Sequence, residues 1–222
     1  MANGNTIYSG PSKLNGQPIK SVITGTKTKS ANVKTGDMAQ MWIMAANERP
    51  TDAAKSGADA SVCGECPHRP LLAKTNGVAP CYVNLGQAPN GVYKSEYSDG
   101  MPTIKKPLRL GAYGEPTALP FELVQDAVNN ADGHTGYTHQ WRTCDQRFKT
   151  LLMASVDSIG EQIEAQAQGW RTFRVRNTSD ATQSNEISCP ASKEAGFRTQ
   201  CADCRLCAGT SRNAKNIVIN AH

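Results

Sequence analysis

The stretch LRLGAYGEPTALPFELVQDAVNNADGHTGYTHQW, residues 108–141, contains the pattern that decides the fold. LRLGAY (108–113) and TGYTHQW (135–141) each predict a strand, because apolar and aromatic residues recur along them. PFELVQDAVNNADG (120–133), which lies between them, predicts a helix with a proline at its start and a glycine at its end. A strand, a helix and a strand joined by short loops are typical of a βαβ unit in a parallel sheet.

Strands and helices continue to alternate on both sides of this unit. Strands are predicted at SVITG (21–25), MAQMWIMA (38–45), LLMASV (151–156), WRTFRV (170–175), EISCPA (186–191) and NIVINA (216–221), with a short extended piece at Tyr82 and Val83. Helices are predicted at 48–57, capped by Thr51 or Asp52 and ending at Gly57, within 90–100, and at 159–169, capped by Asp157 or Ser158. No helix is predicted between 141 and 151.

These elements predict an α/β fold. A complete eightfold barrel needs about 250 residues. A chain of 222 residues that lacks some of the helices fits a partial or irregular βα barrel better, with a doubly wound sheet as the alternative. Residues 1–35 are rich in Gly, Asn, Lys, Ser and Thr and predict a flexible lead-in. Residues 36–222 then form a single α/β domain, which ends in a cysteine-rich segment at 189–207.

Composition and charge narrow the class of protein. Hydrophobic residues make up 38% and charged residues 19% of the chain, and no apolar run approaches the roughly 20 residues of a membrane span. The first residues, MANGNTIYSGPSKLNG, have no apolar core of a signal peptide, so we expect a cytoplasmic protein without membrane contact. The formal net charge is +5. Seven thiolates around two metal or cluster cores of about +2 each would lower it to about +2, which argues little for nucleic acid.

The eight cysteines indicate metal chemistry, because disulfides are rare in a reducing cytoplasm. CADCRLC (201–207) places three thiols two residues apart, and a fourth precedes a proline upstream. This triple, with a distant Cys-Pro, is more typical of a cubane iron–sulfur cluster than of zinc, whose cysteine pairs are separated by long loops. The predicted ligands of this centre are Cys189, Cys201, Cys204 and Cys207.

A second group of cysteines, Cys63, Cys66 and Cys81, lies more than a hundred residues upstream. Three thiols with a fourth position open are the arrangement of a reactive metal site. His68 could instead supply the fourth ligand and close a structural zinc centre, or be an ordinary loop residue. A further alternative is that the two groups converge in space on one shared centre. Cys144 has no partner at metal spacing, so we interpret it as a plain thiol.

Polar residues follow several predicted strands, and chemistry in parallel α/β folds belongs at these carboxyl ends. Glu115 follows the strand at 108–113, and Asp157 follows the strand at 151–156. Three further residues near strand ends, His139, Arg142 and Arg174, are the predicted catalytic or substrate-binding residues. For His139, a satisfied hydrogen-bonding role is the alternative to a general acid or base.

The segment RLGAYGEPTALP resembles the radical SAM enzymes. That family carries a GGEP-like motif at the end of an early barrel strand, where it meets the methionyl amino group of S-adenosylmethionine (SAM). The resemblance implies that Gly114, Glu115 and Pro116 bind SAM, that the upstream cysteine group holds a 4Fe–4S cluster with one open iron, and that the C-terminal group holds an auxiliary cluster. Two features depart from the family: Tyr113 replaces the first glycine, and the usual CxxxCxxC is here CxxC-x14-C.

The chain as a whole also resembles a family of cysteine-rich proteins from bacteriophages and prophages. The shared blocks, which cover most of residues 36–222, are CGECPHR, CYVNLGQ, RLGAYGEP, GYTHQWR, MASVD, GWRTFRVR and CPAS with CADCRLCAG. This resemblance implies a viral gene product that works in the host cytoplasm. It indicates no particular activity.

Two functions follow as hypotheses. The first is an iron–sulfur protein that carries out redox or radical SAM-type chemistry on an unknown substrate with the help of an electron donor, or that keeps a cluster for electron transfer or sensing alone. The second is a zinc-stabilised protein that binds nucleic acid or has a structural role. In the second, the arginines of WRTFRVR (170–176) and RLCAGTSR (205–212) would contact phosphates.

Overall fold

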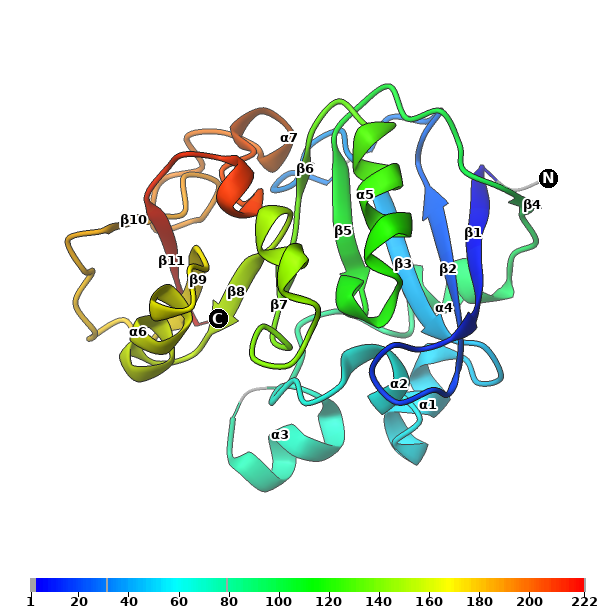
Figure 1. The fold of residues 1–222 in the computed structure, drawn as a ribbon, viewed down its shortest axis with the longest axis horizontal. Coiled ribbons are helices and arrows are strands. Elements are labelled where there is room, and N and C mark those ends of the chain that lie inside the picture. Colours follow the sequence, from blue (N-terminus) through cyan, green and yellow to red (C-terminus); the bar gives the residue numbers. More distant parts are fainter. Residues whose placement is uncertain (1–2, 31, 79, 222) are drawn as a thin grey trace.

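The computed structural model describes residues 3–30, 32–78 and 80–221, and their strands form two sheets (Figure 1). The first sheet has the strand order β4-β1-β2-β3-β5-β6 and is mixed, because β2 runs antiparallel to both β1 and β3 while β3, β5 and β6 are parallel. The second sheet, β10-β11-β9-β8-β7, is wholly parallel. The prediction of an α/β fold is confirmed.

The strands are β1 (Gly4–Pro11), β2 (Pro18–Thr24), β3 (Ala39–Ala45), β4 (Ser98–Asp99), β5 (Leu108–Tyr113), β6 (His134–Thr135), β7 (Tyr137–Thr138), β8 (Met153–Val156), β9 (Thr172–Arg176), β10 (Glu186–Ser188) and β11 (Asn216–Asn220). The α-helices are α1 (Pro50–Ser56), α2 (Ala60–Cys63), α3 (Pro70–Asn76), α4 (Ala88–Lys94), α5 (Phe121–Asn129), α6 (Ile159–Ala167) and α7 (Cys201–Cys204). Three 3-10 helices complete the set: η1 (Pro116–Ala118), η2 (Gln146–Thr150) and η3 (Gly209–Ser211).

The chain passes from the first sheet to the second at Gly136. The Gly136 N–H donates to the carbonyl of Cys207 (2.9 Å), and the Gly136 carbonyl accepts from the N–H of Met153 (3.0 Å). These bonds leave β6 and β7 as two short strands where the sequence predicted one strand over 135–141. His139 therefore lies in the turn after β7, not inside a strand.

Apolar runs explain the central strands. Six of the seven residues of β3 are buried, as are the first four of β11, which is the pattern of strands covered on both faces. Helix α5 contributes Val124 and Ala127 to the main core, and Ala165 of α6 lies in the same core. A smaller apolar cluster consists of Met153, Cys189, Ala191, Cys207, Ile217 and Ile219.

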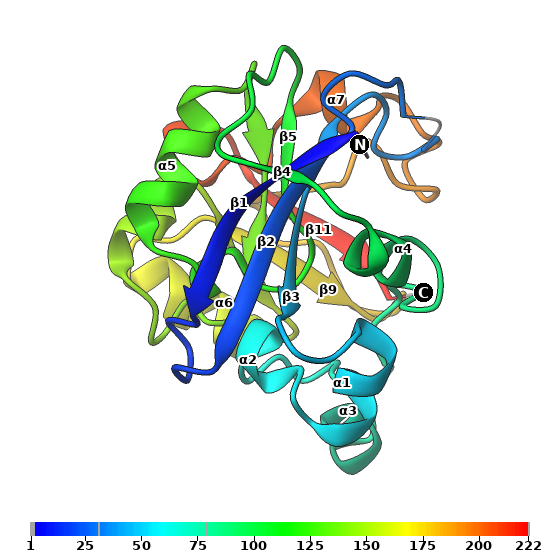
Figure 2. The same cartoon turned by 90° about the vertical axis from the view of Figure 1, so that its right-hand side faces the viewer.

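Three of the helices between β3 and β5 lie at one end of the molecule. Helices α1, α2 and α3 lie beyond the carboxyl end of β3, at the bottom of both views, whereas α7 lies toward the opposite end (Figures 1 and 2). Backbone bonds from Cys201 to Lys34 and from Ala202 to Thr35 hold α7 against the segment that leads into β3.

The prediction of a flexible lead-in at residues 1–35 is wrong for the part that forms β1, whereas β2 overlaps the strand predicted at 21–25. The polar, glycine-rich composition of 4–11 suggested flexibility. Its backbone groups are instead satisfied by antiparallel pairing with β2, which in turn pairs with β3 and buries Ile19, Val22 and Ile23. Residues 1, 2 and 31 of this segment lie outside the described residues.

Several element boundaries also differ from the prediction. Helix α1 begins at Pro50 with Arg49 as its N-cap, not Thr51 or Asp52, because proline favours the first helical position, and it ends before Gly57 as predicted. Helix α4 lies at 88–94, earlier than expected, and α5 ends at Asn129, before the predicted Gly133. Tyr82 and Val83 form no strand. The segment 141–151, predicted without a helix, contains η2.

Candidate functional site

Three polar side chains stand just after parallel strands, one in the first sheet and two in the second. Glu115 follows β5, His139 follows β7 and Asp157 follows β8. The side chains converge, because Glu115 Oε1 lies 3.5 Å from His139 Nδ1 and Asp157 Oδ2 lies 3.7 Å from His139 Nε2. Because β7 and β8 are adjacent parallel strands, His139 and Asp157 leave the same edge of the second sheet, and Glu115 reaches them from the turn after β5 of the first sheet.

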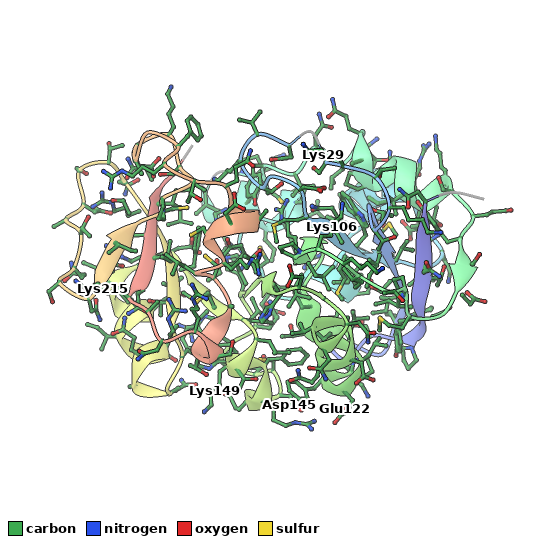
Figure 3. All side chains as sticks on the ribbon, turned by 90° about the horizontal axis from the view of Figure 1, so that it is seen from above. Lys29, Lys106, Glu122, Asp145, Lys149 and Lys215 are labelled. Atoms are coloured by element: carbon green, nitrogen blue, oxygen red, sulfur yellow. The ribbon has the colours of Figure 1, made fainter. Side chains whose placement is uncertain are left out.

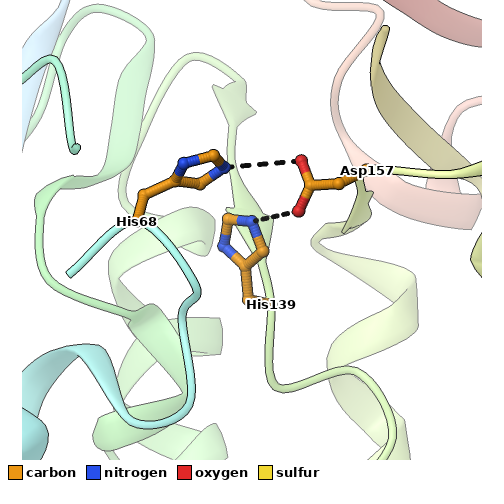
Figure 4. A group of neighbouring side chains, drawn as sticks. All are labelled: His68, His139 and Asp157. Atoms are coloured by element: carbon orange, nitrogen blue, oxygen red, sulfur yellow. Dashed lines mark hydrogen bonds and ion pairs between the residues drawn. The ribbon is translucent and has the colours of Figure 1, made fainter. Parts of the chain in front are cut away.

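His68, from the loop between α2 and α3, completes this cluster (Figure 4). Its Nε2 lies 3.4 Å from Asp157 Oδ1, and its ring meets that of His139 edge to face with centroids 5.7 Å apart. One ligand atom from each of the three residues lies within 4.8 Å of the other two. We call His68, His139 and Asp157 the His–His–Asp group.

Glu115 is buried behind this group, with 7% of its surface exposed. Its Oε1 accepts the backbone N–H of His139 (3.1 Å) and also faces the imidazole Nδ1. Within the described residues, Glu115 Oε2 and His139 Nε2 are buried without a hydrogen bond. A buried polar atom left in this way costs about 1–3 kcal/mol, so two of them in contacting residues mark a polar centre that needs an explanation.

The group holds opposite charges in close contact. Burial acts to lower the pKa of His139, but the neighbouring side chains of Asp157, Cys66 and Glu115 outweigh it and hold that pKa well above 6.5. Burial acts to raise the pKa of Asp157, and the two histidines outweigh it, so the pKa of Asp157 is well below 3.8. In the absence of a bound cation, the charged imidazolium and the carboxylate stabilise each other.

The first cysteine group lies directly beside the His–His–Asp group. Cys63 ends α2, and the N–H of Cys66 donates to the Cys63 carbonyl (3.1 Å), which forms a tight turn. The N–H of Cys81 donates to the His68 carbonyl (2.7 Å), so the fourteen-residue segment before Cys81 folds back onto this turn. The charges of Cys66, Cys81 and Glu115 all act on the Cys63 thiol. The irregular spacing CxxC-x14-C thus still places the three cysteines in one neighbourhood, although within the described residues their sulfur atoms do not all lie within 4.8 Å of one another as the ligand atoms of the His–His–Asp group do.

Arg69 fixes the backbone of this cysteine loop. Its guanidinium donates to the carbonyls of Gly64 (2.9 Å) and Gly57 (3.1 Å) and to the carboxylate of Asp59 (2.7 Å). The N–H of Glu115 donates to the carbonyl of Val62 (2.6 Å). The turn after β5 and the first cysteine group are therefore joined directly by the backbone.

Burial favours the protonated form of two thiols of this group, Cys63 and Cys81. Burial, and next the neighbouring Cys66, raise the pKa of Cys63 well above 9.0, and burial is the main cause that raises the pKa of Cys81. Several thiolates in one buried place repel one another, and a metal centre removes that repulsion. The donor set of three thiols fits a metal or cluster with one ligand position left open.

The second cysteine group gathers around the smaller apolar cluster. Cys189 follows β10 and Cys207 lies beside Gly136, and both are buried. Each of Cys189, Cys201 and Cys204 raises the pKa of Cys207, although burial is the larger cause. Four thiols are the donor set of a closed four-thiolate centre, although within the described residues no three of these sulfur atoms lie within 4.8 Å of one another.

Arg171 organises the loop that carries Cys207. Its guanidinium donates to four carbonyl groups, those of Leu206, Gly209, Ala214 and Lys215. Tyr137 of β7 makes a side-chain hydrogen bond to Cys207. The second cysteine group is therefore attached to the parallel sheet through both backbone and side-chain contacts.

Arg109 of β5 lies near both cysteine groups. It acts electrostatically on Cys81 of the first group and on Cys201 of the second. Its Nη2 also donates to the hydroxyl of Tyr82 (3.3 Å), the neighbour of Cys81. The sequence left open whether the groups share one centre. In the structure each group has its own set of mutually interacting thiols, and Arg109 lies near one member of each.

The structure does not bring Arg142 and Arg174 to the His–His–Asp group. Arg142 stacks on Trp141 and binds Glu161 and Glu164 of α6. Arg174 is buried and donates to both carboxylate oxygens of Glu186, at 2.9 and 2.7 Å. The guanidinium groups of both residues are engaged away from the thiols, whereas His139 lies beside them.

The predicted SAM-binding residues lie in a tight turn. Gly114 has a φ of 83°, and a Cβ at this position would lie 2.5 Å from the carbonyl oxygen of Ile43. Pro116 starts η1 and is buried, and the carboxylate of Glu115 is bound to His139. Cys144 is half-buried against the main core, which agrees with its interpretation as a plain thiol.

Sequence reasoning placed Asp157 at a strand end and His68 in a cysteine loop but did not connect them. Ser158, not Asp157, caps α6, since Ser158 Oγ accepts the N–H of Glu161 (3.1 Å). This cap leaves the Asp157 carboxylate for the two histidines. The signal that could have found the group is the set of polar residues after consecutive strands.

Comparison with protein-family models, with curated proteins and with solved structures finds no match to this chain. Among the described residues, no helix is both long and apolar enough to cross a membrane.

The lysines labelled in Figure 3 lie on separate parts of the surface, with Lys149 and Lys215 on the half that contains β9 and β11 and Lys29 and Lys106 toward the other. Lys106 is bound to Asp37 (2.8 Å).

Proposed function

We propose that this protein is an iron–sulfur protein with a radical-SAM-like partial barrel. The observation that carries the proposal is the position of Cys63, Cys66 and Cys81. They follow β3, gather beyond its carboxyl end and are joined to the turn Gly114–Pro116 that follows the adjacent parallel strand β5. The strand order through the Gly136 junction, which continues with β7, β8, β9 and β11, supports a curved, barrel-like course of the sheet.

In this proposal the first cysteine group holds a 4Fe–4S cluster with one open iron, and Cys189, Cys201, Cys204 and Cys207 hold a second cluster. Such clusters supply single electrons, and an open iron can bind SAM. The turn 114–116 would meet SAM through its backbone, because the Glu115 carboxylate binds His139. His139 lies beside Cys66 and is the residue of the predicted catalytic set that the geometry supports.

The alternative, a zinc-stabilised protein that binds nucleic acid, has less support. The arginines of 170–176 and of 205–212 were its predicted phosphate contacts. Arg205 donates to the carbonyls of Ala202 and Asp132. Arg171 donates to four carbonyls, Arg174 to Glu186, and Arg176 to Asn220 and to the carbonyl of Asp180. Phosphate binding by these groups would have to break internal bonds.

The first experiment is anaerobic purification followed by measurement of iron, sulfide, zinc and the visible spectrum. We expect a brown protein with about four irons and four sulfides per cluster. Loss of the reduced cluster's original EPR signal on addition of SAM would support the radical SAM form. An unchanged EPR signal would indicate a cluster that serves electron transfer or sensing without SAM. A colourless protein that holds zinc, and that gains no iron or sulfide on reconstitution, contradicts the proposal.

Serine variants assign the clusters to their ligands. Cys63→Ser should remove the cluster that responds to SAM and retain the other, whereas Cys204→Ser should do the reverse. Cys144→Ser is the matched control, because this thiol lies outside both groups, and it should leave the iron content unchanged. Equal loss of iron in all three variants would contradict the assignment.

A further inference from the structure

We propose that the His–His–Asp group binds a single divalent first-row metal ion next to the thiols. The inference goes beyond the proposed function and does not depend on it, because the donor atoms here are nitrogen and oxygen instead of sulfur. Two imidazoles and one carboxylate on one side of an ion leave further positions open, which is the ligand set that non-haem ferrous sites use.

The first argument is the separation of the donor atoms. His68 Nε2 lies 3.4 Å from one oxygen of Asp157, and His139 Nε2 lies 3.7 Å from the other. Both separations exceed the usual 2.7–3.2 Å of an N–H···O hydrogen bond. Ligand atoms about 2.1 Å from a tetrahedral ion are about 3.4 Å apart. The separations are thus long for direct hydrogen bonds and close to those of ligand atoms around one ion, and one ligand atom from each residue lies within 4.8 Å of the other two.

The second argument is the support behind His139. Histidines that bind metal ions nearly always give their other ring N–H to a carboxylate, a backbone carbonyl or a water, which fixes the tautomer and the ring orientation. Glu115 occupies this position, with Oε1 at 3.5 Å from His139 Nδ1, and it is itself held by the backbone N–H of His139. This arrangement directs His139 Nε2, which is buried and forms no hydrogen bond within the described residues, toward Asp157.

The third argument is the elements that carry the ligands. His139 and Asp157 follow the adjacent parallel strands β7 and β8, so the sheet fixes their separation. His68 belongs to the loop that Arg69 holds through Gly57, Asp59 and Gly64. Two ligands on a rigid edge and a third on a braced loop form a site that needs little rearrangement to bind an ion.

The test uses metal ions whose ligand preferences distinguish this site from the cysteine groups. Manganese(II) is hard and prefers oxygen and nitrogen ligands over thiolates. We would titrate the anaerobically purified protein with Mn(II) and follow the EPR signal of the free ion. We expect one tightly bound equivalent. Cobalt(II) is the second probe, and its bound form at this site should lack a sulfur-to-metal charge-transfer band.

Asp157→Asn and His68→Gln should each weaken Mn(II) and Co(II) binding by at least about tenfold, in line with the effect of losing even a supporting residue. His68 is on a loop, so its variant also serves if Asp157→Asn does not fold. Asp52→Asn is the matched control, because this exposed carboxylate of α1 binds only Arg49, and it should bind as the parent does. Glu115→Gln should have a smaller effect than either ligand variant.

A triple variant with Cys63, Cys66 and Cys81 changed to serine distinguishes the two proposals. It should lose the first cluster and retain the Mn(II) equivalent. If neither Mn(II) nor Co(II) shows binding that depends on both Asp157 and His68, the inference is overturned. Iron and sulfide in the parent protein would then still support the proposed function. Mn(II) binding in a protein without iron would support the metal site alone.

Discussion

At the scale of single residues, the contacts of two arginines show a structural role where the sequence suggested substrate binding. Arg174 and Glu186 form a pair in which the side chains are 2% and 0% exposed, whereas the Arg142 side chain is 41% exposed in its pair with Glu164. Arginine at a strand end suggested substrate binding in both cases. The contacts instead make Arg174 a partner of a buried carboxylate and Arg142 an anchor for α6.

We predict that Arg174→Met lowers the free energy of unfolding by about 3–5 kcal/mol at neutral pH, because it leaves Glu186 charged and buried without its partner. Arg142→Met, the matched control, should cost no more than about 1 kcal/mol. Urea denaturation followed by circular dichroism measures both. Similar small losses in the two variants would contradict the structural role of Arg174.

The pH dependence of this pair has a definite sign. Burial acts to raise the pKa of Glu186, but Arg174 outweighs it and holds the pKa below 4.5. The pair therefore stabilises the wild-type protein above pH 4.5, and this contribution is lost as the pH falls through the lowered pKa. In Arg174→Met, only the hydrogen bonds from Gln183 and Gln162 still offset burial, so the pKa of Glu186 rises. The deficit of the variant should shrink as the pH falls from neutral toward 4.5, and a constant deficit would argue against this cause.

At the scale of elements, the junction between β6 and β7 determines how the two sheets connect. Gly136 lies in a space without room for a side chain, since a Cβ would lie 2.6 Å from Leu152 Cδ2 and 2.9 Å from Leu110 Cβ. The same residue bonds to Met153 on β8 and to Cys207 of the second cysteine group. A continuous strand was the natural prediction for TGYTHQW, because its pattern does not reveal which neighbours approach the glycine.

We predict that Gly136→Ala lowers the free energy of unfolding by about 1–3 kcal/mol through this overpacking. Gly91→Ala is the matched control in helix α4, where a Cβ meets no atom within 4 Å. It should raise the free energy of unfolding by roughly 0.5–1 kcal/mol, because alanine favours the helix over glycine. Thermal unfolding measures both, and a neutral Gly136→Ala would contradict the close packing at the junction.

At the scale of the whole molecule, the second cysteine group connects distant parts of the chain. It joins Cys189 after β10 to α7, which is bonded to Lys34 and Thr35 ahead of β3, and to Cys207 beside the sheet junction. A metal centre on these thiols would hold the segment 189–207 against both sheets. Its binding energy would then also be folding energy.

We predict that the double variant Cys201→Ser and Cys204→Ser makes the segment 189–207 sensitive to protease while the sheets stay protected. Limited proteolysis with mass spectrometry measures the cleavage sites. Cys144→Ser is the control and should match the parent. Cleavage in the variant that begins in β3 or β5 before the segment 189–207 would show that the centre does not act locally.

How much could be predicted from the sequence depends on the range of the interactions. The strands at β3, β5, β8, β9 and β11 and the helices α5 and α6 were predicted near their actual positions, because local patterns of apolar residues and turn signals specify them. The strand β1 was missed because its stability comes from pairing with β2, not from its own composition. The cysteine groups were recognisable from spacing alone.

The sequence by itself determined the alternating α/β order, the two sets of thiols and the polar residues at strand ends, because these depend on short-range patterns. The tertiary structure alone decided that His68, His139 and Asp157 meet. It also decided that Glu115 contacts the Nδ1 side of His139 and that Arg174 forms an ion pair with Glu186. The physical reason is that the adjacent parallel strands β7 and β8 align the ends from which His139 and Asp157 emerge, while loop packing and the contact between the two sheets bring the other residues to their partners. Residues many positions apart then become neighbours through hydrogen-bond register, which no local pattern contains.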